Sequence, residues 1–566
     1  MIVGIDLGTT HSSIGYFDGR EVTLVPNAAG DVLTPSAVSY HPKTFELLVG
    51  RAAKDIIALH PALGSTGFKR WMGTDMSVLL RGERWTAPEL SACVLRTLRQ
   101  DAERHLGARV ERCVISVPAY FGEAQRHATR QAAELAGLSV ERLVSEPTAA
   151  AIAHGIEHEL SEDRFMVVDL GGGTFDVCIM EMFEGVLQVK GVAGDSQLGG
   201  DDFTRAIMEL AAARAQLCDV ELSAEGRAML LRRAELAKRA LTRWATADID
   251  VPRPDGSVTT VTIAQADAAS AFRPLVARMD RPCRTALSCA ATSSAELDRV
   301  LFVGGAVRMP CISEWVRDRL AKEPTVEQNP DLTVTRGAAL QAAMCARHSA
   351  LEDRVVVDVC SHSLGVAVSR AVGNHITGDY FFPIIERNTV IPVARVERFS
   401  TVSNDQRAIV IEVYEGEARR TTDNRLLGEL RLDGIGPGPS REVVAITFRY
   451  DVSGVLQVEA KDLETGALVS ATLSRNADSS AAIDLHAARI RLAALELNAQ
   501  DQCHFRDALL RAELLWEDLH GEDRERLEGS IRDFEASLTS GAPILIDRAL
   551  RALEAVCHGL DAGQRW

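Results

Sequence analysis

The stretch Val167-Val168-Asp169-Leu170-Gly171-Gly172-Gly173-Thr174-Phe175-Asp176 decides the fold. It predicts an apolar strand that ends in an acid, then a glycine hairpin and a second strand. Successive glycines tolerate positive φ and let backbone N–H groups converge on an anion. The aspartate at the strand end could hold a hydrated divalent cation beside that anion. Taken alone, three glycines in a row more often form a plain hairpin.

The same pattern occurs at the N-terminus, where residues 2–10 read Ile-Val-Gly-Ile-Asp-Leu-Gly-Thr-Thr, and a third glycine turn follows the apolar residues 301–303. This repetition predicts a duplicated fold with two phosphate hairpins facing each other across a cleft. The chain has no GxxxxGK[ST] motif, and Asp176 stands where a dinucleotide fingerprint needs its third glycine. The pattern therefore favours the two-lobed ATPase fold shared by actin, sugar kinases and heat-shock chaperones.

Composition narrows the class of protein further. A length of 566 residues predicts several domains, and a net charge of −17 argues against nucleic acid or an anionic membrane as the main partner. The eleven cysteines show no CxxC or Cys/His metal spacing, which indicates reduced thiols in a cytoplasmic protein. Without a basic leader or a long apolar run, we expect neither a signal peptide nor a membrane span.

Sequence patterns divide the chain into four parts. Residues 1–352 alternate strand-like and helix-like segments, residues 359–478 contain short β-rich runs between turns, and residues 479–566 have helical periodicity. We therefore expect an α/β domain, a β-sandwich and a helical segment. The linker 353–358, Asp-Arg-Val-Val-Val-Asp, fits either a strand that docks on a neighbour in one state or the first strand of the sandwich.

An ordered series of motifs resembles the DnaK-type 70-kDa heat-shock chaperones over nearly the whole chain. The motifs are Gly4-Ile-Asp-Leu-Gly-Thr-Thr10, Gly67-Phe-Lys-Arg-Trp-Met-Gly73, Val114-Ile-Ser-Val-Pro-Ala-Tyr-Phe121, Ala124-Gln-Arg126, Ser145-Glu-Pro-Thr-Ala-Ala-Ala151, Val168-Asp-Leu-Gly-Gly-Gly-Thr-Phe-Asp176, Leu198-Gly-Gly-Asp-Asp-Phe203, Val303-Gly-Gly305, Arg387-Asn-Thr389, Ile391-Pro392, Val413-Tyr-Glu-Gly-Glu417 and Asp423-Asn424. A short segment between Gly73 and Trp85, a long loop 369–386 and a short C-terminal region without an acidic tail resemble the HscC branch.

The resemblance implies an ATP-dependent molecular chaperone, in which a weak ATPase controls the binding and release of short extended apolar peptides. It implies an actin-like two-lobed ATPase domain, an all-β sandwich that binds peptide and a short α-helical lid. The implied partners are client proteins, a J-domain co-chaperone and a nucleotide exchange factor. No motif names the clients, the co-chaperone or the oligomeric state.

The resemblance also implies a site for ATP or ADP with Mg²⁺. Lys69 would orient the attacking water with support from Glu146, and Thr174 would lie near the leaving group. The acids expected to hold Mg²⁺ through its waters are Asp6, Asp169 and Asp176, with Asp169 also counted as catalytic. The residues expected to bind nucleotide are Gly8, Thr9, Thr10, Gly171, Gly172, Gly173, Gly199, Gly200, Glu235, Lys238, Arg239, Gly304, Gly305, Arg308 and Asp331. Ala306 replaces a usual serine; without the family, 235–239 would be an ordinary solvated helix face.

Two further sets follow from the same resemblance. The expected peptide-binding residues are Val366, Phe399, Ile409, Ile411 and Val444 as walls, with Ser369 and Val402 as an arch. By pattern alone each wall residue also fits the sandwich core, and Tyr380, Phe381 and Phe382 could supply apolar area beside Ser369. The residues expected to couple the domains or contact the co-chaperone are Pro118, Arg126, Arg142, Val356 and Asp358.

Two competing functions use the same two-lobed fold. A sugar- or acetate-kinase-like phosphotransferase would need a small-molecule acceptor site and leaves the sandwich without a role. An actin-like filament protein gains no support from the second domain. The match across two domains and their linker favours the chaperone, because the fold alone does not determine function.

Overall fold

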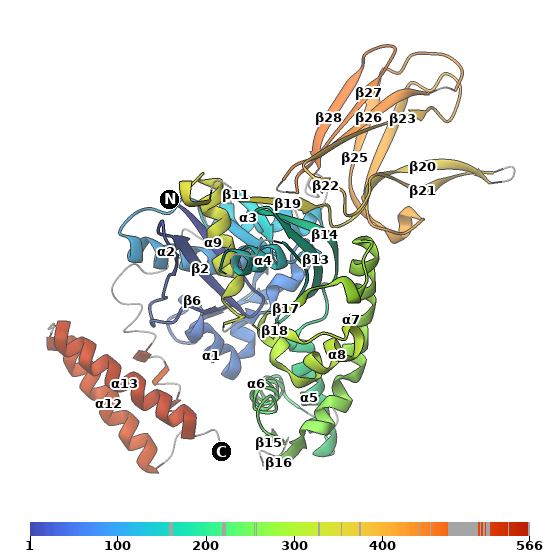
Figure 1. Cartoon of the computed structure of the whole chain (residues 1–566). Helices are drawn as coiled ribbons and strands as arrows, with labels where there is room; N and C mark the ends of the chain where they lie inside the picture. Colours follow the sequence, from blue (N-terminus) through green and yellow to red (C-terminus); the bar gives the residue numbers. More distant parts are fainter. Residues whose placement is uncertain are drawn as a thin grey trace.

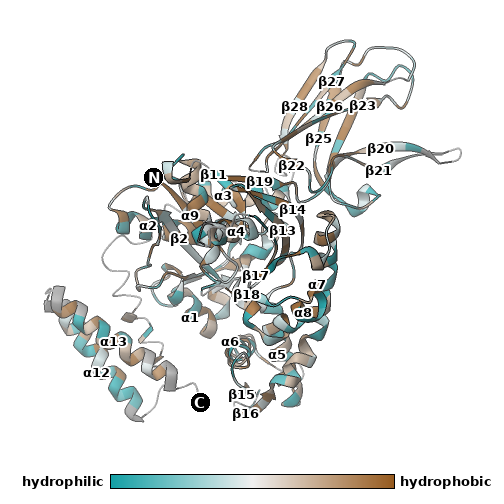
Figure 2. Cartoon of the chain, in the orientation of Figure 1, coloured by the Kyte–Doolittle hydropathy of each residue, from teal (hydrophilic) through white to brown (hydrophobic). Residues whose placement is uncertain are grey.

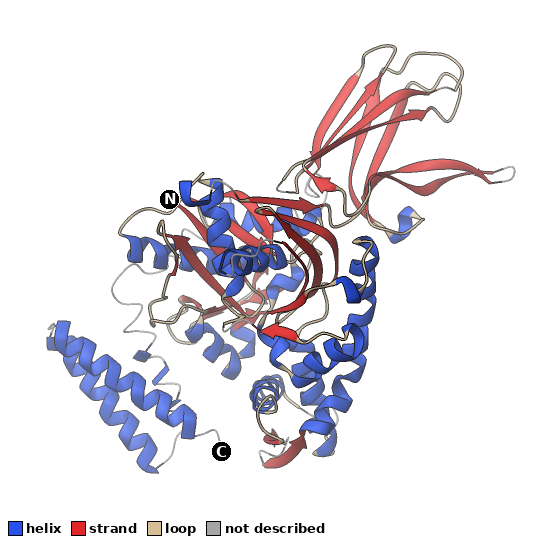
Figure 3. Ribbon diagram, viewed as in Figure 1, coloured by secondary structure: helices blue, strands red, loops and turns tan. Residues whose placement is uncertain are grey.

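The computed structural model describes residues 1–157, 162–217, 222–253, 255, 257–326, 329–351, 354–372, 375–440, 442–452 and 454–473, and near the C-terminus residues 508–509, 511–512, 515–516, 521–540 and 543–563. Figure 1 shows a large α/β domain, a β-sandwich that rises from one side of it, and a separate helical pair. Figure 3 shows that helices and strands mix in the α/β domain, whereas the sandwich is almost entirely strand.

The first half of the α/β domain, residues 1–157, is built on a mixed sheet. Strands β1, β2 and β3 are antiparallel, and β10 and β11 continue the sheet from β1 in parallel. Helix α2 (Ala87–Leu106) starts with a capping box in which Thr86 and Glu89 satisfy the first backbone N–H groups. The sheet runs in the order β11 (Ser139–Ser145), β10 (Arg112–Val117), β1 (Ile2–Leu7), β2 (His11–Phe17) and β3 (Val22–Leu24), with β4 (Thr34–Pro35) beside β2. The remaining elements of this half are β5 (Ala37–Tyr40), β6 (Leu47–Val49), α1 (Arg51–Leu59), η1 (Pro61–Leu63), β7 (Gly64–Thr66), η2 (Phe68–Trp71), β8 (Ser77–Leu80), β9 (Glu83–Thr86), α3 (Glu123–Leu135) and α4 (Glu146–Glu157).

The second half, residues 162–326, repeats that topology. Strands β12, β13 and β14 are antiparallel, and β17 and β18 continue the sheet from β12 in parallel. The repeat agrees with the two similar Asp-Leu-Gly stretches in the sequence. The sheet runs in the order β18 (Pro324–Val326), β17 (Arg299–Val303), β12 (Glu162–Leu170), β13 (Phe175–Phe183), β14 (Val186–Asp195), β19 (Val355–Val359) and β22 (Val390–Ile391). Its other elements are α5 (Gly200–Arg214), α6 (Ala224–Ala240), β15 (Thr246–Pro252), β16 (Val258–Ala264), α7 (Gln265–Cys289), η4 (Ser294–Glu296), η5 (Gly305–Arg308) and α8 (Pro310–Leu320).

Helices α4 and α9 (Thr333–Cys345) join the two halves through one apolar core, which includes residues of both sheets. Glycines allow α9 to lie close to α4 and to β1. A Cβ atom on Gly337 of α9 would lie 1.7 Å from the carbonyl oxygen of Ala149 in α4. A Cβ atom on Gly4 of β1 would lie 2.1 Å from the backbone nitrogen of Ala339. Any side chain at either position would push the halves apart. Figure 2 shows the strands between the helices as the most hydrophobic part of this domain.

The sandwich consists of two four-stranded sheets that enclose their own core, with Phe448, Leu456 and Val458 fully buried. Strand β20 pairs with β24 only over Leu364–Val366, and beyond that point the β20–β21 hairpin projects from the sandwich (Figure 1). One sheet has the order β21 (His375–Ile385), β20 (Leu364–Val372), β24 (Ala408–Glu415), β25 (Arg425–Asp433); the other has β23 (Val393–Ser400), β26 (Glu442–Tyr450), β27 (Leu456–Asp462), β28 (Leu468–Leu473).

The segment between the domains forms strand β19. Val355–Val357 pair in parallel with Val186–Gln188 of β14, and Asp358–Val359 pair antiparallel with β22. One end of β19 therefore extends the sheet of the second half. Its other end pairs with β22, the short strand that precedes β23 of the sandwich. In this structure β19 is docked on β14. Its release from β14 in another state stays a prediction.

The C-terminal region contains helices α12 (Gly521–Ser540) and α13 (Pro543–Gly563), which pack around Leu527, Phe534, Leu550 and Leu553. Figure 1 shows this pair away from the sandwich. The boundary expected at residues 478–479 lies outside the described residues. Among the helices that the structure describes, none is long and apolar enough to span a membrane.

Candidate functional site

Three aspartates meet where the central strands of the two halves end. Asp6 lies near the end of β1, and Asp169 in β12 pairs in register with Asp176 in β13 across the glycine hairpin. Ser116 donates to Asp6 (2.6 Å), and the backbone N–H of Tyr120 donates to Asp176 Oδ1 (3.0 Å). The other carboxylate oxygens of Asp169 and Asp176 are buried without a hydrogen-bond partner in the described part of the chain. Such orphaned oxygens fit the neighbourhood of a cation.

One cation of the protein already lies in this cluster. Lys69 of η2 is only 4% exposed and forms an ion pair with Glu146, the first residue of α4. Its ammonium group lies 5.8 Å from the ring centroid of Phe121. Lys69 is therefore not the surface charge that the pattern Phe-Lys-Arg would suggest without the family motif.

The acids outnumber the base, and this imbalance affects their protonation. Burial, and then the charge of Glu146, raises the pKa of Asp6 to about 6 and that of Asp176 to about 8. Burial and the same neighbour raise the pKa of Asp169 well above its ordinary range. In the described residues no three acid, histidine or cysteine side chains lie close enough to hold a metal directly. Binding of Mg²⁺ through its waters by these acids stays a prediction.

The glycine hairpins of the two halves face each other. A Cβ atom on Gly172 would lie 2.4 Å from Oγ1 of Thr10, and one on Gly173 would lie 2.8 Å from the side chain of Thr9. A Cβ atom on Gly199, just before α5, would lie 2.5 Å from the backbone nitrogen of Gly173. Glycine is therefore required for the two hairpins to approach each other. Gly8 is equally crowded, and Gly171 donates to Thr174 O (3.1 Å).

The expected adenosine residues form two groups beside these hairpins. Glu235 pairs with Lys238 (2.6 Å) and Arg239 (2.7 Å) on α6, and Lys238 also donates to Gly200 O (2.8 Å). Burial opposes the charge of Glu235, but Lys238 lowers its pKa to about 2. The second group surrounds η5. There Arg308 pairs with Asp331 (2.9 Å), Gly304 donates to Pro330 O (3.3 Å), and a Cβ atom on Gly200 would lie 3.2 Å from Ala306. Gly305 lies against Asp331.

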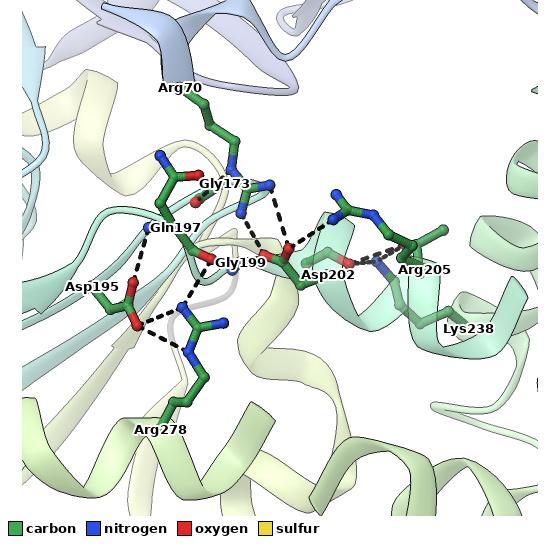
Figure 4. Close-up of polar contacts among 11 residues, drawn as sticks. Arg70, Gly173, Asp195, Gln197, Gly199, Asp202, Arg205, Lys238 and Arg278 are labelled. Atoms are coloured by element: carbon green, nitrogen blue, oxygen red, sulfur yellow. Dashed lines mark hydrogen bonds and ion pairs between the residues drawn. The ribbon is translucent and has the colours of Figure 1, made fainter. Parts of the chain in front are cut away.

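Sequence analysis missed a link between the halves, which Figure 4 shows. Arg70, next to Lys69, donates from Nε to Gly173 O (2.9 Å) and forms an ion pair with Asp202 in the first turn of α5. Asp202 also accepts from the backbone N–H of Gly199 (2.8 Å), so it caps the helix. A second pair, Arg278 with Asp195 (2.7 Å), supports the loop before Gly199. Both residues lie in motifs that are visible in the sequence, but nothing in either motif indicates the other, which lies 132 residues away.

The expected coupling residues lie mostly at the contact with the sandwich. Arg126 is buried, donates to Phe121 O (3.1 Å), and has its Cδ 2.9 Å from the place of a Cβ on Gly454 in the sandwich. Phe121 O also accepts from Ser361 (3.3 Å), and Pro118 accepts from the N–H of Phe121 (3.1 Å). Val356 and Asp358 lie in β19, and Arg142 lies in β11, the edge strand of the first sheet.

The expected peptide-binding residues are not all accessible. Val366, Ile411 and Val444 are at most 3% exposed and belong to the sandwich core, which favours the core interpretation for these three. Phe399 and Ile409 are half-buried, and Phe399 packs edge-on against Phe382 with ring centroids 5.5 Å apart. Ser369 lies exposed on the projecting hairpin and Val402 on the loop after β23, 51% exposed. Tyr380 is buried among Arg370, Arg419 and Arg420, so it offers little open apolar area.

Two glycine hairpins beside a cluster of buried acids, in an α/β domain joined to a β-sandwich, fit a multidomain ATPase. The family model for the Hsp70 protein matches residues 2–81 and 74–514. The chain therefore belongs to the Hsp70 family and is a chaperone of the Hsp70 type. Members of this family bind ATP or ADP with Mg²⁺ and hydrolyse ATP.

Proposed function

We propose that this chain hydrolyses ATP slowly and uses the nucleotide state to control its affinity for extended apolar peptides. One structural relationship carries the proposal. The backbone N–H of Tyr120 donates to Asp176 at the acid cluster, and the carbonyl of the next residue, Phe121, accepts from Ser361 on the sandwich side. Two adjacent residues thus contact the candidate nucleotide site and the second domain. A change in charge at Asp176 would therefore alter the hydrogen bond to Tyr120 and, through Phe121, the contact between the domains.

The acid cluster suits phosphoryl transfer, in which positioning and charge neutralisation matter more than covalent chemistry. Asp6, Asp169 and Asp176 would hold Mg²⁺ through its waters, and the ion would neutralise charge on the phosphates. The backbone N–H groups of the two hairpins would donate to phosphate oxygens. Lys69, held by Glu146, would position the attacking water, with Thr174 near the leaving oxygen.

The β-sandwich would receive the peptide near Phe399, Ile409 and the projecting β20–β21 hairpin. An extended peptide binds such a surface through main-chain hydrogen bonds and an apolar pocket. Coupling is reciprocal, so if ATP lowers peptide affinity, peptide lowers ATP affinity by the same factor. We further propose the HscC-like branch, a J-domain co-chaperone, a nucleotide exchange factor, a cytoplasmic location and a lid role for the C-terminal helices.

Single-turnover ATP hydrolysis with and without a saturating apolar heptapeptide tests the proposal. We expect slow basal turnover that peptide accelerates in the wild type but not in Val356→Asp. Val356 is half-buried and packs on the core below β14, so a charge there would detach β19. Val355→Asp is the matched control, because Val355 is 50% exposed in the same strand and should retain acceleration. Turnover indifferent to peptide in all three proteins would refute coupling and favour a small-molecule phosphotransferase.

A further inference from the structure

Two glutamates from different domains meet where the sandwich docks on the α/β domain. Glu415, at the end of β24, accepts a hydrogen bond through Oε1 from the backbone N–H of Glu123, the first residue of α3 (3.1 Å). A Cβ atom on Gly122 would lie 2.3 Å from Oε2 of Glu415, so the carboxylate lies directly on the helix terminus. Glu123 and Glu415 are 3% and 6% exposed.

The two carboxyl groups have unequal surroundings. The positive end of the α3 helix and the backbone N–H stabilise negative charge on Glu415. Oε2 of Glu123, in contrast, is buried and has no hydrogen-bond partner in the part of the chain that the structure describes. The charged and titratable groups that face Glu123 are Arg126 and Arg130 of its own helix, Glu415 of β24, Tyr450 and Asp451 at the end of β26, and Cys360 after β19.

We propose that docking of the β-sandwich on the α/β domain takes up one proton, which binds the carboxyl group of Glu123. The proton comes from solvent and is returned to it when the domains separate. The nucleotide cycle of this protein would then depend on pH through the domain contact itself. The inference rests on the docked arrangement and not on ATP hydrolysis, so it can fail while the proposed function holds.

The environment of Glu123 determines the direction in which pH changes the docking equilibrium. Burial, and then the charge of Glu415, raises the pKa of Glu123 from 4.5 to about 8 in the docked arrangement. A glutamate freed to solvent regains its ordinary pKa, so between these values the docked state holds one more proton. The docking equilibrium constant therefore falls by up to about tenfold for each unit that the pH rises within this window.

A histidine at the same contact acts in the opposite direction. His362 lies 3.7 Å from Glu415 and packs on Tyr120, and burial lowers its pKa from 6.5. The docked state thus disfavours the protonated form of His362, so its protonation in the separated state, below the ordinary pKa of about 6.5, would oppose docking. Experiments above pH 7 isolate the contribution of Glu123.

The fraction of docked full-length chain can be followed between pH 7 and 8.5 by small-angle X-ray scattering, in the nucleotide state that populates both arrangements at pH 7. We expect the docking constant of the wild type to fall by up to about tenfold per pH unit, the one-proton limit. Glu123→Gln should show a flat profile, whereas Glu415→Gln should keep a shallower slope, because burial still raises the pKa of Glu123 when the charge of Glu415 is gone. Glu134→Gln, exposed at the other end of α3, is the matched control and should behave as wild type. A flat wild-type profile, or a slope that survives in Glu123→Gln, would overturn the proposal.

Infrared spectroscopy tests the same proton directly, even if the chain stays docked at every pH. A protonated buried carboxyl group has a C=O stretch that a carboxylate lacks. We expect this band in the difference between wild type and Glu123→Gln at pH 7, and its loss at pH 9. Absence of the band at pH 7 in the docked chain would also overturn the proposal.

Discussion

Arg70 and Asp202 form an ion pair that joins the two halves of the α/β domain, with both side chains about nine-tenths buried. The same guanidinium donates to Gly173 O in the phosphate hairpin, and the same carboxylate caps α5. One contact thus holds η2 of the first half against two parts of the second half that surround the candidate nucleotide site (Figure 4). Closure of the halves should depend on this pair.

Arg70→Ala should therefore weaken nucleotide binding. Loss of the guanidinium leaves Asp202 buried with less compensation, and we expect about tenfold weaker ADP affinity, about 1.4 kcal/mol, mainly through faster release. Stopped-flow release of a fluorescent ADP analogue measures this. Arg205→Ala is the matched control, because Arg205 contacts the same carboxylate at 3.6 Å but is 53% exposed. Equal release rates in both variants would show that closure does not depend on Arg70.

Binding of Mg²⁺ with nucleotide should release protons. At pH 7 a pKa of about 8 keeps Asp176 largely protonated, and burial raises the pKa of Asp169 in the same direction, whereas a bound cation favours the ionised forms. The affinity for Mg²⁺ with nucleotide should therefore rise as the pH approaches about 8, the pKa of Asp176. The increase should be up to about tenfold per pH unit for each proton released. Calorimetry in two buffers of different ionisation enthalpy counts the protons. Asp176→Asn should release fewer, and identical heats in both buffers would mean that the acids are already ionised.

Local sequence patterns predict the parts of the site that lie close together in the chain. The register of Asp169 with Asp176 follows from a short hairpin between two strands. The shared face of Glu235, Lys238 and Arg239 follows from the helical repeat. These contacts depend on geometry that a few neighbouring residues determine.

Contacts between distant segments could not be predicted in this way. Glu123 and Glu415 are 292 residues apart, and nothing in either segment indicates the other. In the sandwich, alternation of apolar residues identifies one face of a strand but not whether that face meets the core or a ligand. Val366 is therefore a reasonable wall residue by pattern, although the structure buries it in the core.

Lys238 should matter more for stability than its neighbour Arg239. Lys238 is 9% exposed and donates to Gly200 O and Thr204 (2.8 Å each), whereas Arg239 is 60% exposed. In nucleotide-free protein, Lys238→Ala should lower the free energy of unfolding by about 2–3 kcal/mol, and Arg239→Ala by less than about 0.5 kcal/mol. Chemical denaturation measures both. A larger loss for Arg239→Ala would contradict the expectation.

Gly337→Ala should destabilise the chain strongly, because the added Cβ would meet the carbonyl of Ala149 at 1.7 Å and the backbone of α4 cannot turn aside. We expect a loss of about 2–4 kcal/mol in the free energy of unfolding, which lowers the midpoint of thermal unfolding by several degrees.

Gly529→Ala is the matched control. It also lies inside a helix, α12, but nothing lies within 4 Å of its Cβ position, so alanine should stabilise that helix by about 0.5–1 kcal/mol. Because α4 starts with Glu146, Gly337→Ala should also disturb the Lys69 pair and slow ATP hydrolysis, whereas Gly529→Ala should not. Equal stability of the two variants would mean that α4 and α9 do not pack as closely as described.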